Sequence, residues 1–218
     1  MSATASTALW YASRSTGVVA LVMLTAVLVL GVLVNRKRSL PGLPRFATAG
    51  LHRSLSLLAV AFVAVHVITA IADPYVTIGI AAAVVPFTSP YETFWIGLGA
   101  VAIDLMIALV ATSLLRARIG RRTWRGVHWL AYAAWPVALA HSFGSSTDLR
   151  HGYLLWLGIG CMGPVLGAAG WRLLDAATAP PRAALPALVL DQAASPPPAR
   201  PGGAQSPGRR AAARAGAR

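Results

Sequence analysis

Four of the five histidines in this chain lie within apolar stretches, where they form two spaced pairs. Ionisable or metal-binding side chains inside a membrane span are rare and usually functional. His52 and His66 are 14 residues apart, which in a helix is almost four full turns and a rise of about 21 Å. They would lie on nearly one helix face, near opposite sides of a hydrocarbon layer about 30 Å thick. His128 and His141 are 13 residues apart and fall at nearly the same two depths.

Two parallel helices with such pairs can hold two haems, stacked across the bilayer, with each iron between two imidazoles. With both axial positions filled, a haem has no open position for a substrate and transfers electrons instead. Zinc is excluded because its ligands must converge within a few ångströms, whereas the histidines of one helix are about 20 Å apart. The alternative for each histidine is a hydrogen-bonded packing residue.

The composition is that of a membrane protein. Of the 218 residues, 56% are hydrophobic and only 11% are charged, and the charges gather in short clusters. The net charge of +13 comes from basic residues beside apolar stretches or near the C-terminus, so the bilayer with its anionic head groups is the expected partner, and nucleic acid is not. The single cysteine, Cys161, excludes a disulfide framework and a cysteine-ligated cluster.

The hydrophobic pattern predicts an all-α membrane protein, a bundle of five transmembrane helices. The fourth stretch is short and contains Pro136. The expected spans are residues 15–34, 51–72, 93–115, 127–143 and 153–174.

The orientation follows from the loops. Basic clusters follow the first and third spans, which places those loops in the cytoplasm. The other two loops carry three acids, Asp73, Glu92 and Asp148, against Arg150. We therefore expect a multi-pass plasma-membrane protein with residues 1–14 outside and the C-terminus in the cytoplasm. The first span is expected to be retained, because its basic residues follow the apolar run instead of preceding it.

With this topology the second and fourth spans run in the same direction. Depth then pairs His52 with His128 for an inner haem and His66 with His141 for an outer one. At about 100° per residue, however, His128 and His141 point about 140° apart. A kink or local unwinding at Pro136 is expected to realign the second histidine.

The run Leu51-His52-Arg53 to His66, the segment Trp124-Arg125-x-x-His128-Trp129 and the later His141 resemble the ferric reductase-like transmembrane domain. The resemblance covers roughly residues 9–174. It implies the di-haem membrane core shared by ferric reductases, NADPH oxidases and the haem subunit of periplasmic methionine-sulfoxide reductase. In that family matching histidines bind two b-type haems on the third and fifth of six helices. Here they fall on the second and fourth of five.

The domain organisation expected is an extracytoplasmic N-terminus (1–14), the di-haem domain (15–174) and a disordered basic cytoplasmic tail (175–218). The tail is rich in proline, alanine, glycine and arginine and has no aromatic residue, so it cannot bury enough apolar surface to fold. The large reductases carry a flavin and nicotinamide module after the last helix. This chain has no room for one and no GxGxxG fingerprint.

Several further residues are candidates for a role. Arg53 and Arg125 lie at the inner boundary, where haem propionates need a cation, although flanking arginines are also ordinary there. Trp135 lies midway in depth, where it can pack between the haems or simply fill the core. Asp104, near mid-membrane, is either a quinone-site or proton-relay acid or a hydrogen-bonding residue. His151 is expected to be solvated, with ligation of the outer haem as its alternative.

The sequence therefore predicts an oxidoreductase subunit that transfers electrons through iron, bound as two b-type haems. The donor is expected to be a cytoplasmic flavin reductase or a quinol, since the chain has no flavin or NAD(P) site. The acceptor is expected outside, such as ferric iron or a redox partner protein, and the apolar stretch 75–87 is expected to cap the outer haem. The alternatives are a quinol-oxidising membrane cytochrome, with a bound quinone, and a transporter-like protein without haem.

Overall fold

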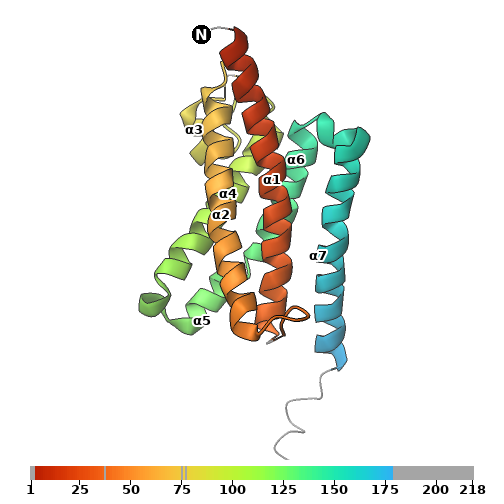
Figure 1. The fold of residues 1–218 in the computed structure, drawn as a ribbon. Helices are drawn as coiled ribbons and strands as arrows, with labels where there is room; N and C mark the ends of the chain where they lie inside the picture. Colours follow the sequence, from red (N-terminus) through yellow and green to blue (C-terminus); the bar gives the residue numbers. More distant parts are fainter. Residues whose placement is uncertain (1–2, 37, 75, 77, 179–218) are drawn as a thin grey trace, which may run out of the picture. The chain divides into compact units, whose positions relative to one another are not determined.

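A computed structural model describes residues 3–36, 38–74, 76 and 78–178 of the chain. These residues form helices and no strand. Residues up to Leu174 make one compact unit and a second begins at Asp175; most of the expected tail, from residue 179 onward, lies outside the described residues. The helices (Figure 1) are α1 (Ala3–Asn35), α2 (Arg45–Ala72), α3 (Ile80–Val84), α4 (Thr93–Leu114), α5 (Arg116–His128), α6 (Ala131–Ser145) and α7 (Gly152–Thr178).

Among the described residues, four helices are long and apolar enough to cross a membrane: α1, α2, α4 and α7. They confirm the expectation of an all-α membrane protein. α6 has 15 residues, a length of about 22 Å, which is less than a hydrocarbon layer of about 30 Å. A crossing by this fourth expected span stays a prediction. The first helix begins at Ala3, so the segment 1–14 is helical from its third residue onward.

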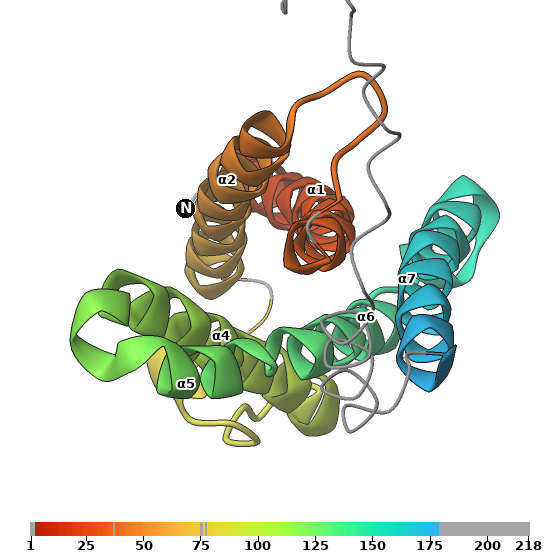
Figure 2. The same cartoon turned by 90° about the horizontal axis from the view of Figure 1, so that it is seen from below.

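The helices pair as two hairpins. α1 packs along α2, and α4 packs along α6, with a further contact between α1 and α6. Figure 2 shows the two pairs facing each other, with α7 beside α6 at the edge. Each hairpin thus consists of one helix without any of the four candidate histidines (α1 or α4) and one segment that carries two of them (α2, or α5 and α6).

The hydrophobic core lies where α1, α6 and α7 meet, and Trp135 is at its centre. The indole Nε1–H donates to the hydroxyl of Thr25 at 2.9 Å, and that hydroxyl donates to the carbonyl of Leu21 at 2.8 Å. Both side chains are buried. The other buried members of the cluster are Leu21, Leu139, Leu149, Cys161 and Val165.

The helix distortion that was expected at Pro136 lies elsewhere in the structure. α6 continues through Pro136, and the chain instead leaves the regular α-helix at Trp129 and Leu130, between α5 and α6. Pro136 has no N–H to donate to the carbonyl of Tyr132, four residues earlier. The distortion lies further towards the N-terminus, so the missing bond of Pro136 does not account for it. The amides of Leu130, Tyr132 and Ala133 bond to carbonyls three residues back. This tighter winding turns each residue by about 120° instead of 100°, in the direction that closes the 140° gap.

Contacts between distant segments hold both ends of the bundle together. At one end Arg14 forms an ion pair with Asp148, and the hydroxyl of Ser6 donates to Asp73 at 3.4 Å. At the other end the guanidinium of Arg36 donates to the carbonyl of Arg172 at 2.9 Å. The acidic and basic ends of the bundle are therefore distinct.

The Thr25–Trp135 bond gives a stability prediction. Thr25→Val keeps the shape of the side chain but leaves a buried indole N–H without an acceptor, which costs about 1–3 kcal/mol. We expect a lower thermal unfolding midpoint for the purified protein in detergent. Thr69→Val is the matched control, because that hydroxyl bonds to carbonyls of its own helix, at Val65 and His66. Equal midpoints for the two variants would contradict the structural role of Thr25.

Candidate functional site

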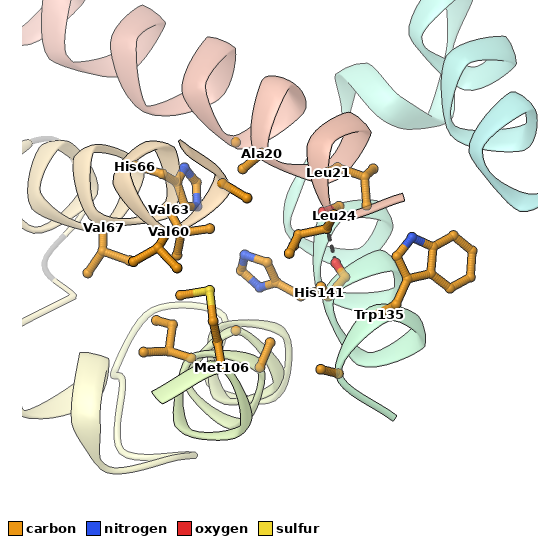
Figure 3. A pocket seen from close by; sticks show the side chains of 18 of the residues that line it. Ala20, Leu21, Leu24, Val60, Val63, His66, Val67, Met106, Trp135 and His141 are labelled. Atoms are coloured by element: carbon orange, nitrogen blue, oxygen red, sulfur yellow. Dashed lines mark hydrogen bonds between the residues drawn. The ribbon is translucent and has the colours of Figure 1, made fainter. Parts of the chain in front are cut away.

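A cavity of about 2010 Å³ lies between the two hairpins, and all four candidate histidines line it. Pockets for one small ligand have volumes of about 300–1,000 Å³. The cavity is therefore large enough for more than one such group. Figure 3 shows apolar side chains, among them Leu24, Val63 and Met106, around the two histidines at one end.

His66 on α2 and His141 on α6 face each other across this cavity (Figure 3). Their ring centroids are 6.3 Å apart, and the ring planes are inclined by 73°. A metal–imidazole bond of about 2.0–2.1 Å places the centroids of two opposed imidazole ligands roughly 6 Å apart. The two rings therefore have the separation of axial ligands to a single metal ion.

Three of the four histidines are held by the same hydrogen bond. In each, the ring Nδ1–H donates to a backbone carbonyl on the partner helix of the same hairpin. This bond fixes the tautomer and leaves Nε2 with a free lone pair, which is the arrangement of a metal-binding histidine. The acceptors are Ser13 for His66 at 2.7 Å, Val27 for His52 at 3.0 Å and Trp95 for His141 at 2.8 Å.

A glycine lies against each of these three rings, four residues after the accepting carbonyl. A Cβ at Gly17 would lie 2.9 Å from the ring of His66, and one at Gly99 would lie 2.7 Å from the ring of His141. At Gly31 the distance to the ring of His52 would be 3.3 Å. Glycine thus allows the helices to approach closely enough for the ring to reach the carbonyl.

These glycines were missed in the sequence. A signal was present, because Gly17 and Gly31 are separated by the same 14 residues as His52 and His66. Two antiparallel helices bring residues with equal spacing into register. Glycines in membrane helices are common for many reasons, however, and only the packing shows which ones contact a histidine.

His128, the fourth histidine, is held differently. Its ring stacks on that of Trp124, with centroids 4.8 Å apart and planes inclined by 25°. Its Nδ1 is buried and has no hydrogen-bond partner among the described residues. His128 and His52 line the same cavity. The structure therefore brings His66 and His141 face to face, and the pairing of His52 with His128 stays a prediction.

Arginines surround the basic end of the cavity. Arg53 and Arg125 are exposed and line it, as expected. Arg172 on α7, which sequence reasoning missed, also lines the cavity. Its guanidinium donates to the hydroxyl of Tyr132 and lies 4.0 Å above the ring of Trp129. Nothing in the sequence indicated this contact, because Arg172 is 40 residues after Tyr132 and reaches it only through the packing of α7.

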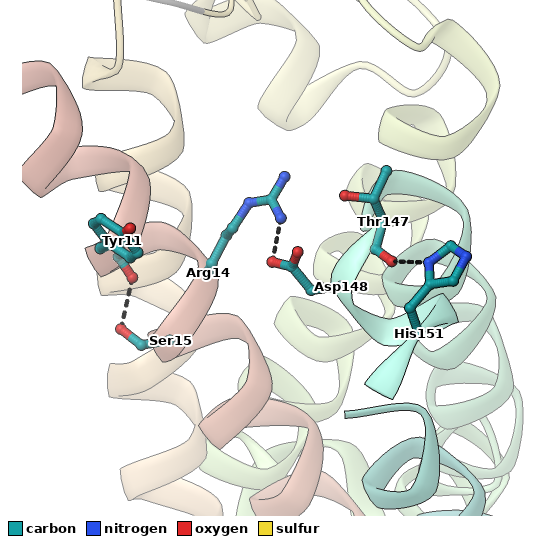
Figure 4. A network of polar contacts seen from close by, with 6 residues as sticks. All are labelled: Tyr11, Arg14, Ser15, Thr147, Asp148 and His151. Atoms are coloured by element: carbon teal, nitrogen blue, oxygen red, sulfur yellow. Dashed lines mark hydrogen bonds and ion pairs between the residues drawn. The ribbon is translucent and has the colours of Figure 1, made fainter. Parts of the chain in front are cut away.

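Of the other candidate residues, Trp135 and His151 line the cavity and Asp104 does not. Trp135 belongs to the core, and its ring points towards α7, away from His141 (Figure 3). Asp104 is exposed on α4 and does not line the cavity. His151 is exposed at the acidic end, where its Nδ1 donates to the carbonyl of Thr147 at 3.1 Å, beside the Arg14–Asp148 ion pair (Figure 4).

The stretch expected to form a cap folds as the short helix α3 and its flanking turns. Phe87 has a positive φ of 64° and lies against Gly97 of α4, where a Cβ would come within 2.2 Å of the phenyl ring. Val76, Ile78 and Ala82 line the cavity. The segment thus anchors on α4 and contributes apolar groups to the cavity wall.

The donor set restricts which metal group can bind. No three His, Cys, Asp or Glu side chains gather into a metal site within the part of the chain that the structure describes. Each histidine pair offers two imidazole nitrogens, whereas a structural zinc site uses four protein ligands. A metal held here must therefore bring its remaining ligands with it.

The comparison with family models agrees with this geometry. Residues 16–139 match the model described as ferric reductase like transmembrane component, which is more than half of the chain. The chain belongs to this family. The matched region of this ferric reductase-like protein contains His52, His66 and His128, and His141 follows two residues after its end. No curated protein and no solved structure matches the chain.

The glycine contacts of the ferric reductase-like domain can be tested by stability. Gly99→Ala places a methyl group against the ring of His141 and should displace it from the carbonyl of Trp95; such overpacking costs about 1–3 kcal/mol. We expect a lower thermal unfolding midpoint. Gly160→Ala is the control, since a Cβ there meets no atom within 4 Å. Equal unfolding midpoints for the two variants would show that the close approach of Gly99 to the His141 ring does not contribute to stability.

Proposed function

We propose that this ferric reductase-like membrane protein transfers electrons across the plasma membrane through two bis-histidine b-type haems. His66 and His141 hold the outer haem, and His52 and His128 hold the inner one. The observation that carries the proposal is the 6.3 Å separation of the His66 and His141 rings at the wall of a large apolar cavity. Membership of the ferric reductase-like family supports the same activity.

The residues present fit a haem at both levels. The Nδ1 bonds of His52, His66 and His141 direct Nε2 as a ligand atom, and a haem supplies the remaining four nitrogen ligands that the chain lacks. When bound, the haem provides a one-electron couple. Apolar walls around the rings keep water out of the cavity, which favours a reversible electron carrier over a site that binds oxygen or substrate.

The charged groups at the two ends of the cavity have different roles. We assign Arg53 and Arg125 to the propionates of the inner haem, because both line the basic end of the cavity and guanidinium groups bind carboxylates in bidentate fashion. The basic end faces the cytoplasm by the positive-inside rule. The acidic end, with Asp73 and Asp148, faces outward. Trp135 packs in the core beside the cavity and holds α6 on α1 through its bond to Thr25.

The partners follow from this topology. A cytoplasmic flavoprotein or a membrane quinol donates electrons at the inner haem. An extracytoplasmic acceptor, such as ferric iron or a redox partner protein, receives them at the outer haem, beside the segment that contains α3. The protein is then the haem-bearing part of an oxidoreductase system and does not itself bind the hydride donor.

The haem content and its pairing are tested together. We expect two b-type haems per chain by pyridine haemochrome analysis. His66→Ala or His141→Ala should remove the outer haem. His52→Ala or His128→Ala should remove the inner haem. The reason is that a low-spin haem of this kind needs two axial imidazole ligands. Each variant should show about half of the reduced-minus-oxidised absorbance.

His151→Ala is the matched control and should retain both haems, because that ring is exposed and bonded to Thr147. A purified protein without haem would reject the proposal in favour of a transporter-like protein. Loss of the same haem in His52→Ala and His141→Ala would reject the pairing.

The dependence on a donor gives a second prediction. Purified protein should not oxidise NADH or NADPH, and its haems should be reduced only by a quinol, an added flavin reductase or dithionite. In vesicles, an impermeant ferric chelate on the acidic side should reoxidise haems that were reduced from the basic side. Oxidation of NADH by the lone protein would show a nucleotide site on this chain. Reoxidation of the haems only when the chelate is on the basic side would show that electrons flow in the opposite direction.

A further inference from the structure

The three bonded histidines share one arrangement on the partner helix. A carbonyl accepts the Nδ1–H bond, and a glycine four residues later makes room for the ring. On α1 this arrangement occurs twice, and the two glycines, Gly17 and Gly31, are 14 residues apart. On α4 it is seen once, at Gly99. Fourteen residues after Gly99, on nearly the same face of α4, the residue is Ser113.

The residues around Ser113 resemble those around Gly17. Thr16 precedes Gly17, and its hydroxyl donates to the carbonyl of Ala12 at 2.6 Å, with the carbonyl of Ser13 at 3.1 Å. Thr112 precedes Ser113, and its hydroxyl donates to the carbonyl of Ala108 at 2.7 Å, with the carbonyl of Leu109 at 3.3 Å. Leu109 is four residues before Ser113, so its carbonyl is the counterpart of the acceptors at the other three histidines.

His128 does not use this carbonyl. Its Nδ1 is buried and has no partner within the described residues, and the ring is held by stacking on Trp124. The indole Nε1–H of Trp124 donates to the hydroxyl of Ser113 at 3.4 Å. The side chain of Ser113 thus contacts the indole that stacks on His128, at the position where the other three sites have glycine.

We propose that Ser113 is a positioning residue that makes the inner haem chemically different from the outer one. Its Cβ keeps His128 from the carbonyl of Leu109, so this ligand lacks the Nδ1 bond that its three counterparts have. A hydrogen bond at Nδ1 makes Nε2 a stronger donor, which stabilises ferric iron and lowers the reduction potential. Ser113 therefore raises the potential of the inner haem. This inference rests on the proposed function.

The test is Ser113→Gly in the full-length protein. Removal of the side chain should let the His128 ring reach the carbonyl of Leu109 and shift the midpoint potential of the inner haem downward. The outer haem is an internal control and should keep its midpoint. Potentiometric titration of a protein with His66→Ala, which retains only the inner haem, assigns the two midpoints. Ser113→Ala is the matched control: it keeps the Cβ, so its midpoint should stay near that of the wild type.

Ring ¹H–¹⁵N spectra of the histidines provide a readout that does not need electron transfer. The wild type should show hydrogen-bonded Nδ1–H signals for His52, His66 and His141, and Ser113→Gly should add one for His128. The spectra are recorded on the reduced protein, or on haem-free protein if none is bound. A missing haem would reject the proposed function, and the spectra would still decide the role of Ser113.

Two results would overturn the inference. One is an unchanged His128 signal in Ser113→Gly, together with an unchanged inner midpoint if haem is bound. The other is an equal change in Ser113→Ala and Ser113→Gly, which would assign the effect to the hydroxyl instead of the space that glycine leaves.

Discussion

The arrangement of this bundle depends on one hydrogen bond, from a histidine Nδ1–H to a backbone carbonyl of the neighbouring helix. In an apolar interior an unbonded ring N–H costs free energy, so the bond fixes both the tautomer and the direction of Nε2. It forms only where the helices approach closely, and Gly17, Gly31 and Gly99 provide that approach. The same contact therefore sets the register of each hairpin and the position of its candidate ligands.

The two helices of each hairpin have different roles in this contact. α1 and α4 provide carbonyls and glycines, while α2 and the α5–α6 segment provide the histidines. Because each ring is held within its own hairpin, Nε2 points into the space between the hairpins. The cavity therefore forms where both hairpins direct ligand atoms, and its width is set by the pairing of α1 with α6 and by the core around Trp135. α7 completes that core from the edge.

The sequence predicted those features that depend on depth and periodicity. The spacings of the four histidines were enough to predict that His66 faces His141. Apolar length predicted five crossing helices, and four helices among the described residues have the length and composition to cross. The features that it did not predict depend on contacts between distant segments. The glycine contacts require the hairpin register, and the place of Arg172 requires the docking of α7. The distortion was predicted at Pro136, but it lies at Trp129 and Leu130, before the carbonyl of Tyr132 on which that proline acts.

The turn between α5 and α6 is irregular backbone within the segment that is expected to form the fourth span. Irregular backbone is tolerated in a bilayer only where its polar groups are satisfied. At Trp129 and Leu130 the amides bond to carbonyls three or four residues back, so the turn between α5 and α6 leaves neither of these donors free. The turn also ends α5 at His128, whereas His141 lies within α6. One histidine of this segment is therefore placed by a helix end and an aromatic stack, and the other by a carbonyl and a glycine.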